Sequence, residues 1–166
     1  RNLYLHELRK EPQLDGYRDD WVYLEHNFTT LQSIDGRLAA SVFLGRHDRY
    51  LFLLMGVTDP SVRLGPDGDA VDLAYTNADG ELRRIRVQPQ APGCVVPRIL
   101  SDGDAQTYET AIRGEWQNTQ NGYTLELRIP NHLLQDRLSL RLFDSDSRQM
   151  LASGYLGRHP NRVDRA

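Results

Sequence analysis

The chain of 166 residues is poor in the residue types that carry metal, redox and covalent chemistry. Its one cysteine, Cys94, excludes an internal disulfide and any zinc site built on several cysteines. It has one lysine, Lys10, so a mechanism that forms a Schiff base on a lysine amine is not favoured. The 20 basic and 23 acidic residues give a net charge of −3, without the basic excess typical of a nucleic-acid-binding protein. We therefore expect no nucleic-acid partner.

Long hydrophobic segments are also missing. The longest apolar run, residues 50–57, is far shorter than the roughly 20 residues of a membrane-spanning helix. The length suits one domain, and a chain of this size buries roughly 68–70% of its unfolded surface on folding. The sequence starts at Arg1, without Met and without a charged-then-apolar leader, so we expect it to be a segment of a longer protein.

Sequence motifs of common enzymes are absent. The chain has no Gly-x-Ser-x-Gly elbow, no phosphate-binding loop, no Gly-x-Gly-x-x-Gly and no His-Glu-x-x-His. Surface or packing roles are expected for the five histidines, which have no metal-ligand spacing: His6, His26, His47, His132 and His159. A small enzyme stays open as an alternative, because two carboxylates suffice for glycoside hydrolysis.

Aspartates form three groups along the chain. The groups are Asp15, Asp19 and Asp20; Asp67 and Asp69; and Asp144 and Asp146. Such groups supply the hard oxygen ligands that Ca²⁺ prefers. Their spacing matches no EF-hand loop, so we interpret Asp144-Ser145-Asp146-Ser147 as a turn, with calcium as a minority alternative. No other cofactor is expected.

Hydrophobic periodicity predicts strands almost throughout. Tyr123, Leu125, Leu127 and Ile129 alternate with polar residues, as in a strand with one buried face. The predicted strands are residues 38–44, 50–58, 70–76, 82–88, 108–116, 123–129, 138–142 and 150–156. A helical turn is expected at 131–135 and a long surface loop at 89–106. This pattern favours an all-β fold, an antiparallel β-sandwich that is jelly-roll-like.

One predicted hairpin places polar side chains together. If residues 70–76 and 82–88 pair through the turn at 77–80, then Val71, Leu73, Tyr75, Ile85 and Val87 face inward. The opposite face then carries Asp72, Arg84, Arg86 and Gln88. These groups could hold hydroxyls or a carboxylate by directional hydrogen bonds. The alternative, favoured from periodicity alone, is a solvated face with a cross-strand ion pair.

Several motifs, in order, resemble family 9 carbohydrate-binding modules. Leu14-Asp15-Gly16 followed by Asp19-Asp20-Trp21 is similar to that family's opening "DG…D..W". Val57-Thr58-Asp59, Asp69-Ala70-Val71-Asp72, Gly122-Tyr123 with Ile129-Pro130, and the strand ending in Asp144 resemble its later motifs. The resemblance implies a non-catalytic β-sandwich that binds the exposed end of a glycan through Asp72, Arg86 and Gln88.

Two aromatic positions depart from that family. Its sugar-binding members clamp the ring between two tryptophans, one just before the "DSVE" motif and one near the C-terminus. This sequence has Gly65-Pro66-Asp67 at the first place and no tryptophan after Trp116. We assign Trp21 and Trp116 to the core or its edge.

A second resemblance concerns biological context. The run from Leu3 to Leu8, with Leu14-Asp15-Gly16 and Asp19-Asp20-Trp21 after it, looks like the extracytoplasmic sensor region of a proteobacterial histidine kinase group linked to a dedicated sortase system. It implies a periplasmic, membrane-tethered input domain, with a small molecule, glycan or cell-envelope component as ligand; a homodimer stays open. We expect a lead-in at 1–11, the sandwich at 12–157 and a tail at 158–166. The alternatives are an accessory module of a secreted glycoside hydrolase and a structural spacer.

Overall fold

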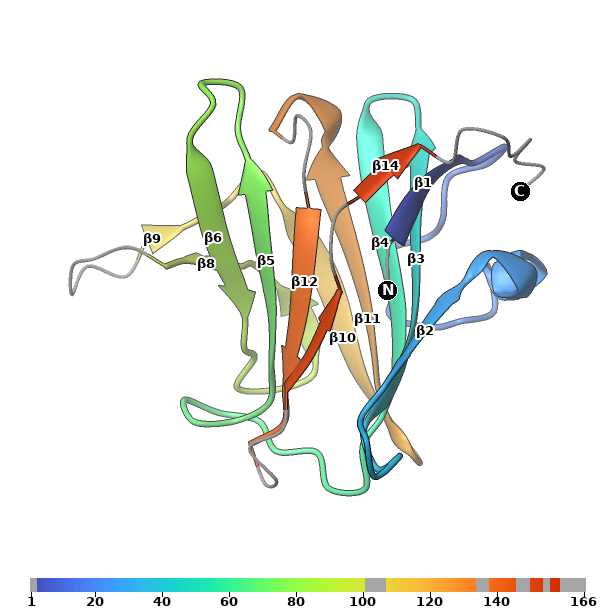
Figure 1. Cartoon of the computed structure of the whole chain (residues 1–166), viewed down its shortest axis with the longest axis vertical. Helices are drawn as coiled ribbons and strands as arrows, with labels where there is room; N and C mark the ends of the chain where they lie inside the picture. The colour runs from blue at the N-terminus through green and yellow to red at the C-terminus, as the bar shows by residue number, and fades with distance from the viewer. Residues whose placement is uncertain (1–2, 101–106, 134–137, 146–149, 154–155, 159–166) are drawn as a thin grey trace.

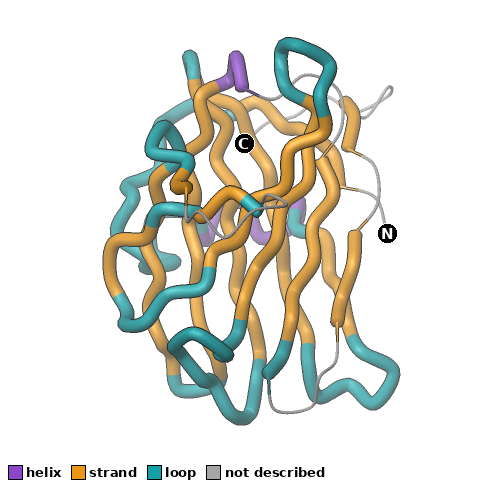
Figure 2. Tube along the Cα trace, turned by 90° about the vertical axis from the view of Figure 1, so that its left-hand side faces the viewer, coloured by secondary structure: helices purple, strands orange, loops and turns teal. Residues whose placement is uncertain are grey.

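The computed structural model is a sandwich of two β-sheets, which confirms the predicted fold class (Figure 1). It describes residues 3–100, 107–133, 138–145, 150–153 and 156–158. The strands run along the long axis of the molecule, with loops at both ends (Figure 2). Two short 3₁₀ helices accompany them, η1 (Val22–Asn27) and η2 (Asn131–Leu133). Within these described ranges, no helix has the length and hydrophobicity needed to span a membrane.

The larger sheet has eight strands. They are β1 (Leu3–Glu7), β2 (Thr29–Gln32), β3 (Ala39–His47), β4 (Tyr50–Thr58), β7 (Gly93–Val95), β10 (Arg113–Thr119), β11 (Gly122–Pro130) and β14 (Leu156–Arg158). Their order is β14-β1-β3-β4-β11-β10-β7, and β2 pairs with β3. The pairs β1–β3 and β1–β14 are parallel, so the prediction of a wholly antiparallel sandwich is wrong at this edge.

The smaller sheet has six strands. They are β5 (Ala70–Thr76), β6 (Leu82–Val87), β8 (Arg98–Ile99), β9 (Thr107–Tyr108), β12 (Leu138–Phe143) and β13 (Met150–Ser153). Their order is β13-β12-β5-β6-β8-β9, and every pair is antiparallel. The β5–β6 hairpin has the predicted strands, which end at Thr76 and begin again at Leu82.

Two predicted strands are in fact broken where the chain crosses between sheets. The expected strand at 108–116 divides into the end of β9, in the smaller sheet, and β10, in the larger. A turn closed by the hydrogen bond from Ile112 N to Glu109 O separates them. The expected strand at 150–156 likewise divides into β13 and β14. The expected loop at 89–106 contains β7 and β8, whereas 101–106 lie outside the described residues.

The ends of the described chain also belong to the larger sheet. β1 lies inside the expected lead-in, and its Leu3 is buried in the core. β14 reaches Arg158, the first residue of the expected tail. η2 occupies the first part of the expected helical turn at 131–135, whose last two residues lie outside the description.

The main core fills the space between the sheets. The inward residues of the β5–β6 hairpin are at most 2% exposed, as the alternation predicted: Val71, Leu73, Tyr75, Ile85 and Val87. Trp116 lies in this core, where its ring stacks on Tyr123 with 3.8 Å between centroids. Burying each large aliphatic side chain stabilises the fold by about 1.5–3 kcal/mol.

A second apolar layer covers the outer side of the larger sheet. Phe43, Phe52 and Leu54 point outward from β3 and β4, yet they are buried. The N-terminal segment covers them with Leu8, Trp21 and Leu24. Gly45 permits this contact, because a Cβ there would lie 2.7 Å from Leu8 Cγ. The N-terminal segment is therefore an integral part of the sandwich.

Candidate functional site

The outer side of the smaller sheet carries a row of polar side chains across four strands. Strand register places Arg141 of β12 opposite Asp72 of β5, Asp72 opposite Arg86 of β6, and Arg86 opposite Arg98 of β8. Arg84 stands two residues before Arg86 on the same side of β6. The predicted common face of Asp72, Arg84 and Arg86 is thus present, while its role in ligand binding stays a prediction.

Asp72 and Arg86 form a two-pronged ion pair at the centre of this row. Arg86 Nε donates to Asp72 Oδ1 at 2.7 Å, and Nη2 donates to Oδ2 at 2.9 Å. The two side chains are 20% and 33% exposed, so each keeps polar atoms accessible to solvent. A bidentate pair fixes both planar groups, which gives their remaining hydrogen-bonding positions defined directions. The predicted cross-strand ion pair and the predicted polar face are therefore both present, and the ion pair is part of that face.

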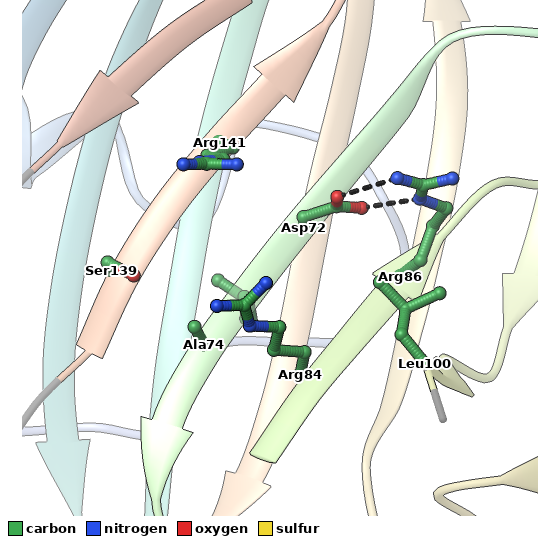
Figure 3. Close-up of a pocket in the computed structure, with 8 residues that line it drawn as sticks. Asp72, Ala74, Arg84, Arg86, Leu100, Ser139 and Arg141 are labelled. Carbon is green, nitrogen blue, oxygen red and sulfur yellow. Dashed lines mark hydrogen bonds and ion pairs between the residues drawn. The ribbon is translucent and has the colours of Figure 1, made fainter. Parts of the chain in front are cut away.

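A hollow of about 210 Å³ lies on one side of this pair. Its polar side chains are Asp72, Arg84, Arg86, Ser139 and Arg141, and Ala74 and Leu100 contribute apolar side chains. Figure 3 shows Arg141 on β12, whereas the guanidinium group of Arg84 comes from β6 and lies over β5 next to Ala74. Three strands thus present charged groups to one small space.

A second hollow, of about 190 Å³, shares Arg86 with the first. The residues that line it are Pro66, Arg86, Gln88, Gln90, Val96, Arg98 and Tyr108. The Gln88 side chain is held there, since Nε2 donates to the Gly68 carbonyl oxygen at 2.9 Å. Tyr108 is 50% exposed. Together with Pro66, it supplies flat apolar contact surface in the hollow.

In the described part of the chain, the second hollow is lined by Pro66 and Tyr108 and by no tryptophan, unlike the clamp of the sugar-binding family that the sequence resembles. Pro66 occupies the place at which the resemblance expected the first tryptophan. Both tryptophans of this chain are instead buried, with Trp21 1% and Trp116 0% exposed, which confirms their assignment to the packing of the domain. The sequence did not indicate Tyr108, because its strand β9 has only two residues and no periodicity.

Three buried carboxylates meet at one end of the sandwich. Asp59 follows β4, Asp69 precedes β5 and Asp144 follows β12; one oxygen of each lies within 4.8 Å of the others. Asp69 Oδ1 accepts hydrogen bonds from the Ser145 amide and hydroxyl, each at 3.0 Å. The Asp59 oxygen Oδ2 is buried and has no hydrogen bond to a described residue. Burial, followed by the neighbouring Asp69 and Asp144, raises the pKa of Asp59 to about 7.

This cluster has the donor set of a calcium site. Carboxylate oxygens are the ligands that Ca²⁺ prefers, and a cation would remove the cost of burying three acids together. Of the predicted candidates, Asp69 and Asp144 belong to it and Asp67 is exposed, whereas Asp146 lies outside the described residues. Asp59 was missed, although its place directly after a buried strand was a signal.

A further buried acid lies on the covered side of the larger sheet. Glu126 of β11 is 0% exposed, and within the described ranges neither of its oxygens accepts a hydrogen bond of ordinary length. Burial, and then the nearby Asp20 and Asp15, raises the pKa of Glu126 to about 9. The prediction that β11 has only one buried face is wrong, because the N-terminal segment covers its second face.

The aspartates of the N-terminal segment support that covering. Asp15, Asp19 and Asp20 offer oxygens within 4.8 Å of one another. Asp20 accepts a hydrogen bond from the Gln13 amide, which closes the segment on itself. Gly16, with a φ of +82°, makes the turn between Asp15 and Tyr17, and a Cβ there would lie 2.5 Å from Gln117 Cγ. The Asp-Gly motif thus brings the segment against β10.

Comparison with known proteins identifies the architecture. No family model and no curated protein matches the chain. The fold is similar to a family 9 carbohydrate-binding module from Caldicellulosiruptor kristjanssonii in complex with cellotriose, with a TM-score of 0.62 and 17% identity over 100% of this chain and 99% of that one. The module from the same organism in complex with glucose gives 0.59 and 15%, over 98% and 99%.

A third solved structure has the same architecture. It is a protein from Bacteroides uniformis, provisionally named carbohydrate-binding, with a TM-score of 0.61 and 11% identity over 99% of this chain and 94% of that one. These identities establish a common fold only. The chain therefore has the β-sandwich fold of family 9 carbohydrate-binding modules.

Proposed function

We propose that this domain binds a saccharide, without catalysis, on the outer side of its smaller sheet. The observation that carries the proposal is the bidentate Asp72–Arg86 pair at the junction of the two hollows. Such a pair presents both acceptors and donors at fixed positions. Because sugar hydroxyls both donate and accept hydrogen bonds, they match this mixture.

The residues around the pair support binding over catalysis. Among the described residues that line the two hollows, Asp72 is the one carboxylate, and no histidine is present. Hydrolysis by an acid and a base would need a second titrating group across the cleft. The similar folds add support, since two of those modules are in complex with cellotriose and glucose.

The biological placement is a finer part of the proposal. We place the domain as the periplasmic, membrane-tethered input of a sensor histidine kinase, on the resemblance of the segment around Leu3 to Leu8 and Asp19-Asp20-Trp21. Saccharide binding would bias the kinase only through different affinities for two conformations. The alternative, a binding module attached to a secreted glycoside hydrolase, draws on the similar folds. The sequence of the full-length gene product distinguishes the two by its catalytic domain.

Calorimetry with single substitutions tests the binding function. Wild-type protein is titrated with glucose, cellotriose, galactose and their uronic acid counterparts where these exist. We expect Arg86→Ala and Asp72→Ala each to weaken binding at least tenfold, since each removes one half of a charged hydrogen-bonding pair. Arg113→Ala, an exposed site on β10 of the other sheet, is the matched control and keeps wild-type affinity.

Two outcomes would contradict the proposal. One is wild-type protein that binds none of the saccharides; the other is full affinity in both Arg86→Ala and Asp72→Ala. Thermal unfolding of each variant shows whether a loss of binding reflects the site or the fold. The ion pair is partly exposed, so its removal should cost only about 1 kcal/mol of stability.

A further inference from the structure

The outer side of the smaller sheet carries more positive charge than a neutral sugar requires. Four arginines line the two hollows, Arg84, Arg86, Arg98 and Arg141, against one acid, Asp72. The described lining residues thus have a formal surplus of three positive charges, although the whole chain has a net charge of −3. The charge is therefore concentrated at this face.

Among the described residues, one of these four arginines has an ion-pair partner and three do not. Arg86 is neutralised by Asp72 through two hydrogen bonds. Arg84, Arg98 and Arg141 form no ion pair with any residue in the described part of the chain. Arg84 and Arg141 are exposed at the rim of the first hollow. The cross-strand ion pair that would make this face purely structural accounts for one of the four arginines.

Arg84 and Arg141 approach the first hollow from different strands. Arg141 stands on β12 and Arg84 on β6, with β5 between them, as Figure 3 shows. Like charges that line one small hollow repel each other, and an anion placed between them removes that repulsion. Guanidinium groups are planar forks that match a carboxylate by paired hydrogen bonds. The Ser139 hydroxyl, in the same hollow, can donate a further bond.

We infer that the saccharide is acidic and that its carboxylate binds in the first hollow, between Arg84 and Arg141. This inference rests on the proposed saccharide-binding function. The sugar hydroxyls are then in reach of Asp72 and Arg86, and the apolar faces of Ala74 and Leu100 contact the ring. A uronic acid is the simplest sugar with this combination. The preference therefore differs from that of the similar modules in complex with glucose and cellotriose, which are neutral.

Matched sugar pairs test the inference. Calorimetry compares D-glucuronate with D-glucose and D-galacturonate with D-galactose, because each pair differs only at C6. In at least one pair we expect the acid to bind at least tenfold more tightly at low salt. The advantage should shrink as NaCl rises to about 0.15 M, where the Debye length is about 8 Å.

Substitutions of Arg84 and Arg141 test whether these two groups bind the carboxylate. Arg84→Gln and Arg141→Gln should each weaken binding of the acid about fivefold or more, and each should weaken binding of the acid more than binding of its neutral partner. Arg113→Gln, on the other sheet, should change neither. Both tested arginines are exposed, so the variants should unfold at the wild-type temperature.

The outcomes separate the inference from the function beneath it. If the neutral member binds as tightly as the acid, or if neither arginine substitution affects the acid, the inference is overturned and saccharide binding remains. If no sugar of either pair binds, and cellotriose does not bind, the proposed function and the inference are both overturned.

Discussion

The two outer sides of this sandwich differ sharply, although both are formed by strands that pack their other face into the same core. On the larger sheet, outward residues of β3 and β4 are apolar, and the N-terminal segment covers them with Leu8, Trp21 and Leu24. On the smaller sheet, outward residues of β5 and β6 are Asp72, Arg84 and Arg86, and two hollows that share Arg86 remain open on this side. The outer side of the larger sheet is a buried apolar layer, whereas the outer side of the smaller sheet exposes charged groups to solvent.

The difference shows what the outward residue of a strand determines. An outward Phe or Leu must be covered, and in this chain Leu8, Trp21, Leu24 and Phe28 of the N-terminal segment pack over that side. An outward Arg or Asp remains hydrated at little cost, so the face needs no cover and keeps its access to ligands. Under the proposed function, ligand binding and the stabilising apolar layer lie on opposite outer sides of the sandwich.

The largest expected effect comes from a substitution in the N-terminal segment that covers the larger sheet. Trp21 is 1% exposed and stacks on Phe28, with 5.1 Å between ring centroids. Trp21→Ala should therefore lower the free energy of unfolding by about 3–5 kcal/mol, as measured by urea denaturation. Tyr17→Ala, in the same segment but 58% exposed, should change it by less than about 0.5 kcal/mol. Equal effects from the two variants would mean that the segment does not form a packed layer.

The buried carboxyl group of Glu126, on the covered side of the larger sheet, should make the free energy of unfolding depend on pH. Its pKa is raised from 4.5 to about 9, so between these values the folded state holds a proton that the unfolded state has lost. This group's contribution to stability is therefore fully present below about pH 4.5 and is lost as pH rises towards 9. Glu126→Gln has no such loss. Relative to wild type, it should gain up to about 1.4 kcal/mol per pH unit across this window.

Urea denaturation of both proteins at pH 5, 6.5 and 8 measures that gain. Glu81→Gln, on the exposed turn of the β5–β6 hairpin, is the control for the same chemical change. A constant difference between wild type and Glu126→Gln at all three pH values would show that Glu126 is not held neutral by burial.

The acid cluster at the end of the sandwich should respond to calcium. If Ca²⁺ binds Asp59, Asp69 and Asp144, it stabilises the fold by about 2.7 kcal/mol at a hundredfold excess over its Kd. Because the pKa of Asp59 is about 7, protons compete with the metal, and the rise in Tm should be larger at pH 8 than at pH 6.

Substitutions assign that calcium effect. Asp59→Asn should abolish the rise in Tm, while Asp67→Asn, at an exposed position two residues before Asp69, should preserve it. Chelation with EGTA returns wild-type protein to its starting Tm. A Tm that does not change with millimolar Ca²⁺ at pH 8 would show that these acids are stable together without a metal.

The smallest expected effect concerns the aromatic surface on the open side. Tyr108 is half exposed in the second hollow, where its ring can contact the apolar face of a sugar. Aromatic contacts contribute about 0.5–1.5 kcal/mol, so Tyr108→Ala should weaken saccharide binding about two- to tenfold by calorimetry. Tyr108→Phe keeps the ring and should bind as wild type does. Unchanged affinity in Tyr108→Ala would confine the ligand to the first hollow.

Local alternation was sufficient to predict the parts of the fold that repeat it. β4 and β5 have the predicted ends, and the hairpin face with Asp72, Arg84 and Arg86 follows from a period of two. The burial of Trp21 and Trp116 was also predictable, because neither stands at the position of a sugar-clamping tryptophan of the family that the sequence resembles. These features depend on neighbours in the sequence or on a single turn.

The missed features depend on contacts between distant segments. β8 and β9 have two residues each, too few for any periodicity, so pairing within the sheet sets the place of β8 beside β6 and of β9 beside β8. Glu126 has the alternation of an exposed residue and is buried only because the N-terminal segment folds over it. Asp59 joins its partners only because the ends of β4, β5 and β12 meet in space.

The parallel pairing of β1 with β14 has a mechanical consequence. Leu3 pairs with Leu156 and Leu5 with Arg158, so the first and last described strands lie side by side and point the same way. A pull applied before Leu3 and after Arg158 would act on these strands in opposite senses along their axes. It would load their hydrogen bonds together, in shear, instead of opening them one at a time, and the domain would transmit tension between its two ends as a stiff link.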